Sequence, residues 1–207
     1  MIFNVDKLSP EQLIEYVAIK EPRREDDIVQ ICNLCDVEKA KIIASNSTWL
    51  TVGFSSYHLT LPIAKAFSKN KTVNTLIFQY GCSFDDGVFK ELAHIPSLRK
   101  LLLPCCKITT KQILEMLECK KWEVIDLFYS NLEDEVLKPI LNDKTWKVIN
   151  LGGNNFCKEN YKLLRELDDL YHSYIFDDSM SIEQKEQMIR TIYTYGNELH
   201  HRYNTPV

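Results

Sequence analysis

A pattern of apolar residues returns five times along this chain and limits the folds that the chain can adopt. The units begin at Trp49, Val73, Leu98, Trp122 and Trp146, and two further apolar rows follow three and five residues later. These rows are Val52, Leu76, Leu101, Ile125 and Ile149, and then Phe54, Phe78, Leu103, Leu127 and Leu151. Each unit closes on an apolar residue, namely Leu59, Phe84, Ile108, Leu132 or Phe156, which the second unit reaches one residue late. Self-similarity at a fixed period of this length indicates a repeat architecture in which neighbouring units shelter one another.

The second half of each unit repeats with a different spacing. One row is Ala64, Phe89, Leu114, Leu137 and Tyr161, and the row three residues later is Phe67, Leu92, Leu117, Ile140 and Leu164. A spacing of three places both rows on one face of a helix. The change from a period of two to a period of 3.6 therefore predicts a strand followed by a helix in every unit.

The third unit shows the consensus most clearly, as Leu98-x-x-Leu101-x-Leu103-x-x-Cys106-x-Ile108. At its ninth position, the turn position, the five units carry Tyr57, Gly81, Cys106, Ser130 and Asn154. Over residues 49–170 the chain resembles the ribonuclease-inhibitor type of leucine-rich repeat. The resemblance implies an α/β solenoid, a short horseshoe with parallel strands on the concave face and helices on the convex face. The chain is also similar to small leucine-rich-repeat effectors of intracellular bacteria, some of which bind and block another effector enzyme.

Both ends of the array are predicted to be helical caps, since the end units of a repeat array need protection. Residues 1–48 form the N-terminal cap, with helices expected at about 9–21, 26–35 and 37–44. The first of these starts at Ser9-Pro10, with Gln12 placed for a capping box. Residues 171–207 form the C-terminal cap, with a helix expected at about 182–200.

Composition narrows the classes of partner. The 207 residues carry a net charge of −4, and no run of Lys or Arg exceeds two residues, so a nucleic-acid partner is not expected. No apolar run approaches the roughly 18 residues of a spanning helix, and the first residues lack a secretory signal, so no membrane partner is expected. The seven cysteines are odd in number and mostly lie in apolar patterns, which favours a reducing cytosol. We expect a cytoplasmic monomer, in the host-cell cytosol if the chain is a delivered effector.

No cluster of residues predicts catalysis. Cys32-x-x-Cys35 lacks a second ligand pair and is expected within a helix, as a buried structural feature. Cys105 would need an aligned base, and His58 and His94 lie in other units. The sequence therefore predicts a protein that is not an enzyme and that uses no cofactor and no metal.

The fifth, seventh and eighth positions of each strand are predicted to point away from the core. In the middle units they form a candidate partner-binding face of apolar, aromatic and polar residues: Ile77, Gln79, Tyr80, Leu102, Cys105, Asp126, Phe128 and Tyr129. Arg99 is expected to add a further polar contact there. Aromatic residues on an exposed face indicate an interface. We expect a module that inhibits or regulates a partner protein, which includes another effector enzyme, through its repeat surface.

An F-box-like substrate adaptor of a ubiquitin ligase is the alternative function. The N-terminal region is weakly similar to an F-box over Leu8–Ile14, Ile31–Cys35 and Ala44–Leu50. F-box proteins often carry leucine-rich repeats directly after that module. Lys20-Glu21-Pro22-Arg23-Arg24 replaces the usual apolar end of the first helix.

Overall fold

The computed structural model describes residues 2–4, 8–17, 28–32, 37–46, 48–79, 81–143, 145–151, 154–157 and 160. All of them lie in one compact unit that spans Met1–Lys162. Seven parallel strands of this part form one sheet in the order β1-β2-β3-β5-β7-β8-β9. Their bounds are β1 Ile2–Asn4, β2 Ile28–Cys32, β3 Thr51–Ser55, β5 Thr75–Gln79, β7 Lys100–Leu102, β8 Val124–Asp126 and β9 Val148–Asn150.

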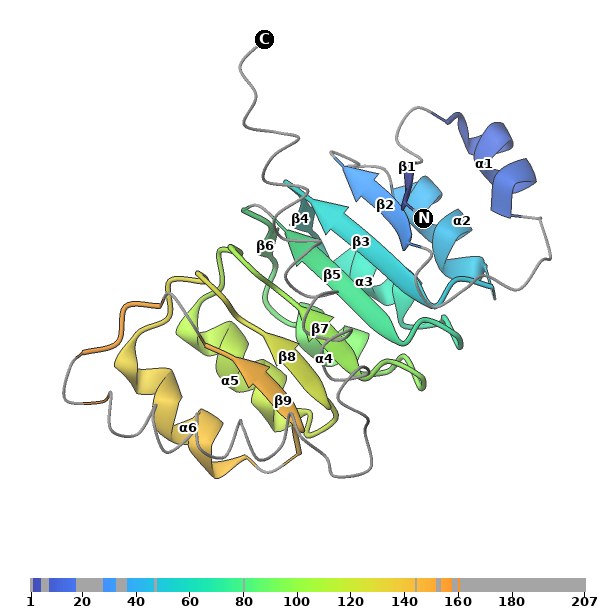
Figure 1. The fold of residues 1–207 in the computed structure, drawn as a ribbon. Helices are drawn as coiled ribbons and strands as arrows, with labels where there is room; N and C mark the ends of the chain where they lie inside the picture. Colours follow the sequence, from blue (N-terminus) through green and yellow to red (C-terminus); the bar gives the residue numbers. More distant parts are fainter. Residues whose placement is uncertain are drawn as a thin grey trace, which may run out of the picture. The chain divides into compact units, whose positions relative to one another are not determined.

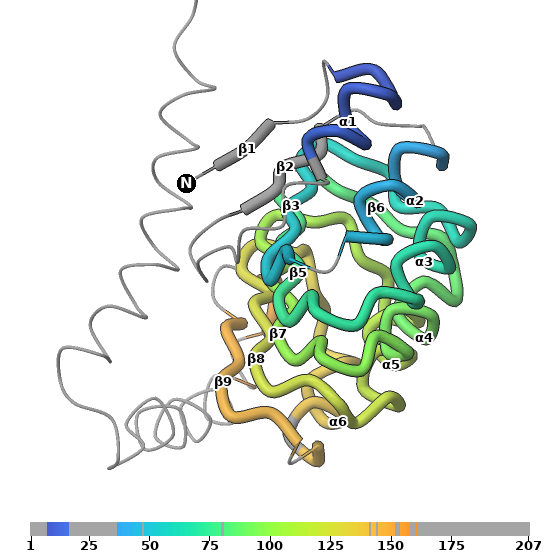
Figure 2. Tube along the Cα trace, turned by 90° about the vertical axis from the view of Figure 1, so that its right-hand side faces the viewer, coloured from blue at the N-terminus to red at the C-terminus, as the bar shows by residue number. Residues whose placement is uncertain are grey.

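A helix follows each strand of the sheet as far as β8. The helices are α1 Pro10–Val17, α2 Val37–Ser45, α3 Leu61–Phe67, α4 Val88–Leu92, α5 Thr110–Glu118 and α6 Leu137–Asn142, the last preceded by the 3-10 turn Asp134–Val136. Two short strands, β4 His58–Leu59 and β6 Ser83–Phe84, pair with each other outside the main sheet. Figures 1 and 2 show the strands in one layer and α2 to α6 in a second layer on one side of it. The predicted mixed α/β class with a parallel sheet is confirmed.

The register of the sheet follows the sequence repeat. Thr51 lies opposite Thr75, and the same row continues through Lys100, Val124 and Val148. These residues are separated by the same 24- and 25-residue steps that separate the five units in the sequence. A one-residue slip would turn every core side chain to the other face, so the apolar rows specify this register.

The predicted apolar rows form the core between the two layers. The row from Val52 to Ile149 is at most 5 % exposed, and the row from Phe54 to Leu127 is at most 1 % exposed. Trp146 and Leu151, in the last unit, are half-buried. In the first two units the core is aromatic: Phe54 and Phe78 stack with ring centroids 4.8 Å apart. Burial of large apolar side chains of this kind stabilises the fold by about 1.5–3 kcal/mol each.

One predicted helix position is wrong. Leu114 in α5 is 38 % exposed, whereas its neighbour Ile113 is fully buried. The buried face of this helix therefore runs through Ile113, Met116 and Leu117, so that Ile113 replaces Leu114 while the predicted burial of Leu117 is confirmed. With Ile113 and Met116 in the rows, the step to Leu137 and Ile140 is 24 residues, as it is between the strands. Adjacent residues of an α-helix point about 100° apart, so the packing of the helix decides which of the two apolar residues is buried.

The turn position of the second unit is also corrected. Cys82, and not Gly81, occupies it, because the extra residue of that unit lies before the turn. Thiol, hydroxyl or amide groups in this row donate to backbone carbonyls of the preceding unit: Cys82 to Phe54, Cys106 to Phe78, Ser130 to Leu103 and Asn154 to Leu127, at 3.7, 3.4, 2.8 and 2.8 Å. Four side-chain contacts of the same kind thus join the five consecutive units, and each pairs a backbone carbonyl with a side-chain donor.

The N-terminal region differs from the predicted helical cap. α1 and α2 match two of the expected helices, but the helix expected at 26–35 is wrong, since Ile28–Cys32 is strand β2 and pairs with both β1 and β3. The spacing of the apolar residues fits a helix, yet a run of β-branched residues also suits a strand, and the open edge of β3 provides a partner. Cys32 therefore lies in a strand, and Cys35 lies outside the described residues.

The C-terminal predictions lie beyond what the structure describes. The helix expected at 182–200, the cap at 171–207 and the repeat boundary at 170 all fall outside the described residues. In the described part of the chain, every helix is too short or too polar to cross a membrane.

Candidate functional site

The turns at the carboxyl ends of the strands share an unusual backbone conformation. Ser56, Gly81, Cys105 and Tyr129 have φ angles of 49°, 77°, 57° and 51° and occupy the equivalent place in four successive units. Glycine adopts positive φ without strain, whereas the side chain of any other residue costs about 1–2 kcal/mol there. Tyr129 is the bulkiest residue of this row, at a place where the second unit carries glycine. Strained positions of this kind cluster at functional sites.

Exposed and half-exposed apolar residues lie on β7 and in the turns that follow β7 and β8. We define the aromatic patch as Leu102, Cys105, Phe128 and Tyr129. The rings of Phe128 and Tyr129 meet edge to face with centroids 4.6 Å apart, and the Cys105 amide donates to the Phe128 carbonyl at 2.7 Å. Tyr129 is 60 % exposed, which is more than either of the other two large apolar residues that are exposed in the described part of the chain, Ile14 and Leu114.

Three residues predicted to lie on the open face are buried instead. Ile77, Gln79 and Asp126 are 8 %, 7 % and 6 % exposed. Side chains that lie opposite each other on neighbouring strands are about 5 Å apart. Residues on the central strands of a sheet therefore shield one another from solvent. Tyr80 lies outside the described residues. Of the predicted partner-binding residues, the four of the aromatic patch are the ones that the structure brings to the surface or half-exposes.

Asp126 lies at the base of the aromatic patch, opposite Leu102 of β7 and Asn150 of β9. Its carboxylate accepts a hydrogen bond from the backbone N–H of Phe128 at 3.0 Å. Burial raises the pKa of Asp126 from its usual 3.8 to about 6, although hydrogen bonds from Phe128 and Asn150 act in the opposite direction. In the part of the chain that is described, no Lys, Arg or His forms an ion pair with Asp126. Burial thus penalises the charged form of this carboxyl more than its hydrogen bonds favour it.

Cys105 does not have the environment of a nucleophile. Its thiol is exposed, and desolvation together with the nearby charge of Asp126 raises its pKa. A raised pKa disfavours the thiolate that attacks substrates. Within the described residues no hydrogen bond joins Cys105 to a histidine: His94 lies beside Glu91, and His58 bonds elsewhere.

His58 belongs to a hydrogen-bonded trio that the sequence did not predict. Its Nδ1 lies 2.8 Å from Ser83 Oγ and its Nε2 lies 3.0 Å from Asp85 Oδ1. These are the residue types of a hydrolytic triad, but the second oxygen of Asp85 accepts the Leu61 N–H at the start of α3. This backbone hydrogen bond is the main cause that lowers the pKa of Asp85. The imidazole and carboxylate are also widely open to water, at 53 % and 41 %. The arrangement ties the second unit to the start of α3 in the first unit, which is a capping role.

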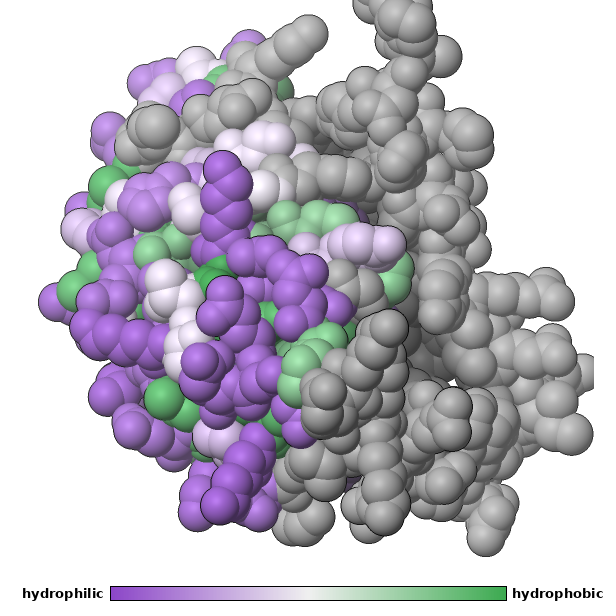
Figure 3. Space-filling view, turned by 90° about the vertical axis from the view of Figure 1, so that its left-hand side faces the viewer, coloured by the Kyte–Doolittle hydropathy of each residue, from purple (hydrophilic) through white to green (hydrophobic). Residues whose placement is uncertain are grey.

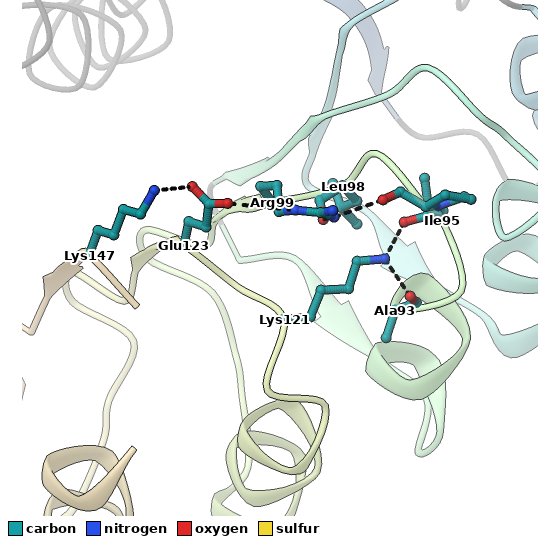
Figure 4. A network of polar contacts seen from close by, with 8 residues as sticks. Ala93, Ile95, Leu98, Arg99, Lys121, Glu123 and Lys147 are labelled. Atoms are coloured by element: carbon teal, nitrogen blue, oxygen red, sulfur yellow. Dashed lines mark hydrogen bonds and ion pairs between the residues drawn. The ribbon is translucent and has the colours of Figure 1, made fainter. Parts of the chain in front are cut away.

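At the amino ends of the strands, opposite the turns described above, charged side chains form contacts within the protein. Figure 4 shows Lys147 beside Glu123, and Glu123 beside Arg99, with N–O distances of 3.0 and 3.6 Å. Arg99 Nη1 also donates to the carbonyls of its own loop, and Lys121 Nζ donates to the carbonyls of Ala93 and Ile95. Arg99 was expected to contact a partner, but its guanidinium forms these contacts within the protein instead.

Figure 3 looks onto the side of the molecule toward which the strands point, and the described residues that it colours are largely hydrophilic with scattered hydrophobic ones. Among the described residues, no group of three or more His, Cys, Asp or Glu side chains is arranged to hold a metal ion.

Sequence comparison gives no identity for the chain. No protein-family model matches it, and no curated protein matches it. The sequence signal that could have found the trio at His58 is the repeat itself, because Ser83 lies one unit after His58 along the chain and the two residues pair in the structure.

Proposed function

We propose that the chain is a leucine-rich-repeat solenoid that binds another protein through the aromatic patch and thereby inhibits or regulates it. Support comes from the 24- and 25-residue register of β3, β5, β7, β8 and β9 and from the turn row that joins successive units. Neighbouring units that shelter one another in this way leave one face of the strands for a partner.

The observation that carries the proposal is Tyr129. The side chain occupies a left-handed position, packs edge to face on Phe128 and still leaves 60 % of its surface exposed. Folding alone favours glycine at such a place, as in Gly81 of the second unit. Exposed aromatic side chains dominate the binding energy of many interfaces, because they bury large areas at low cost in conformational entropy.

The partner is proposed to be a protein, with another effector enzyme as the first class to test, and the site of action to be the cytosol. A non-enzymatic role is supported by the raised pKa of Cys105 and by the capping role of the trio at His58. The F-box-like adaptor gains no specific support, since part of its proposed motif lies in strand β2, where a helix was expected.

A capture experiment with matched variants tests the proposal. The full chain is immobilised and exposed to lysates of host and bacterial cells, and captured proteins are identified by mass spectrometry. A specific partner is retained by L114A, which removes an exposed apolar side chain on the helix side, and is lost by Y129A. For the purified pair, Y129A is expected to weaken binding about 30-fold, the equivalent of about 2 kcal/mol.

Equal capture by wild type and Y129A, or equal loss in L114A, would contradict the proposed surface. Capture of the linker subunit of a ubiquitin ligase that is abolished by L8A and L13A, and not by Y129A, would favour the adaptor function instead.

A further inference from the structure

A shallow groove of about 730 Å³ opens on the helix side of the protein, away from the strands. It lies between the ends of α2 and α3, which are neighbours in Figure 2, and reaches Glu91 of α4. The small side chains of Ala44 and Ala66 lie along it and leave the space open. Its volume falls in the range of pockets that hold small molecules, which is about 300–1,000 Å³.

The charge around this groove is opposite to that of the whole chain. Lys41, Lys65, Lys69 and Lys71 line it, against the single acidic residue Glu91, and we call it the lysine groove. All four lysines are exposed, and none of them takes part in an ion pair within the described residues. Since the protein as a whole carries a net charge of −4, the groove concentrates positive charge that the fold does not use.

The neutral polar groups of the lysine groove are already occupied. Ser45 and Ser68 each donate a hydroxyl hydrogen bond to a carbonyl of their own helix, at 2.7 and 2.9 Å. The amide of Asn70 donates to the carbonyls of Ala44 and Asn46, both at 2.8 Å. What remains for a ligand is the apolar surface that makes up most of the lining and the ammonium groups of the lysines, so polar recognition depends on negative charge and not on the pattern of donors and acceptors that a neutral sugar would need.

We infer that the lysine groove binds a multiply phosphorylated anion. Lysine is a common phosphate ligand and acts as a point charge on a flexible stem. The carbonyl ends of α2 and α3 also face this region and carry partial negative charge, which disfavours an anion held by one lysine alone. An anion with several phosphate groups overcomes this by contacting several ammonium groups at once. Such a ligand is either free in solution or the headgroup of a phosphorylated lipid.

Calorimetric titration of the full chain with inorganic triphosphate tests the site. Wild type is expected to bind at low salt and to weaken as salt is added, because exposed charges are screened. The double variant K65E/K69E is expected to bind at least about tenfold more weakly, a loss of about 1.4 kcal/mol. The control K107E/K138E changes the net charge equally on exposed lysines outside the groove and is expected to bind like wild type.

Circular dichroism establishes that each variant is folded, and K65Q/K69Q replaces the first variant if charge reversal at the end of α3 prevents folding. No binding by wild type, or equal binding by wild type and K65Q/K69Q or K65E/K69E, would overturn the inference. An equal loss in K107E/K138E would also overturn it, because the effect would then be one of net charge.

Vesicle sedimentation separates the two sources of the anion. Vesicles of phosphatidylcholine with a phosphatidylinositol bisphosphate are compared with vesicles brought to equal charge by phosphatidylserine. Lysine-dependent sedimentation with the bisphosphate lipid alone supports the inference and assigns a lipid headgroup. Triphosphate binding without sedimentation supports the inference and assigns a free ligand.

Discussion

Replacing Asp126 by asparagine is expected to make the protein more stable near neutral pH. The carboxylate is 6 % exposed and has a pKa of about 6 in the folded protein, against a usual value of 3.8. The folded protein therefore holds this proton at pH values where the unfolded chain has lost it. Stability contributed by the protonated group is complete at low pH and is lost as the pH rises through about 6.

The size of the effect follows from the two pKa values. A difference of about 2 pKa units corresponds to about 3 kcal/mol once both states are ionised. The amide that D126N introduces keeps one oxygen, which accepts the Phe128 N–H, so the variant removes the buried charge and retains that hydrogen bond. The carboxylate also takes a hydrogen bond from Asn150, which the variant keeps only if the same oxygen accepts it. The stability gain of D126N over wild type should rise by about 2 kcal/mol between about pH 4.5 and pH 7.5.

Urea denaturation of both proteins across this pH range, followed by circular dichroism, measures the difference. Comparing two proteins at each pH cancels the titration of all other groups. The control E133Q removes the same charge from an exposed position and should show little pH-dependent difference from wild type. A D126N difference that does not change with pH, or a variant that is less stable than wild type at pH 7.5, would refute this account of Asp126.

Three further predictions concern stability and are measured by urea denaturation at neutral pH. Y129G should be more stable than Y129A by about 1 kcal/mol, because the backbone φ of 51° favours glycine; equal stability would mean that this turn is not left-handed. L101A should lose about 3 kcal/mol, since this side chain is fully buried, and L102A, which is half-buried, should lose less than half as much. N154A should lose about 2 kcal/mol or more, because the amide donates to two carbonyls and accepts two N–H groups, whereas the exposed N155A should be near neutral; similar losses in both would argue against the turn row.

Much of the strand layer could be predicted from the sequence. The apolar rows beginning at Val52 and Phe54 are buried, and Leu76, Leu101, Ile125 and Ile149 lie in parallel strands as expected. Such rows are visible in the sequence because each is repeated and because a buried position tolerates few residue types.

Where a local sequence pattern fits two structures almost equally well, only the tertiary structure decided between them. Ile28–Cys32 fits a helix or a strand, and pairing with β3 decided for the strand. Ile113 and Leu114 are both apolar neighbours on one helix, and packing buried Ile113. The position of the extra residue in the second unit was likewise ambiguous in the sequence, and the contact from Cys82 to the Phe54 carbonyl in the turn row decides it.

The spacing of apolar residues determined by itself the two apolar rows that the strands bury, from Val52 and from Phe54, and how those strands register, since periodicity is a local property of the chain. Which outward positions remain open was decided only by the tertiary structure. Asp126 ends β8 and Tyr129 lies in the turn that follows, yet Asp126 is 6 % exposed and Tyr129 is 60 % exposed. The exposure of each side chain depends on the side chains of neighbouring strands, which lie about one repeat away in the sequence, and on the φ angle of the turn. A short segment of sequence reveals neither of these two factors.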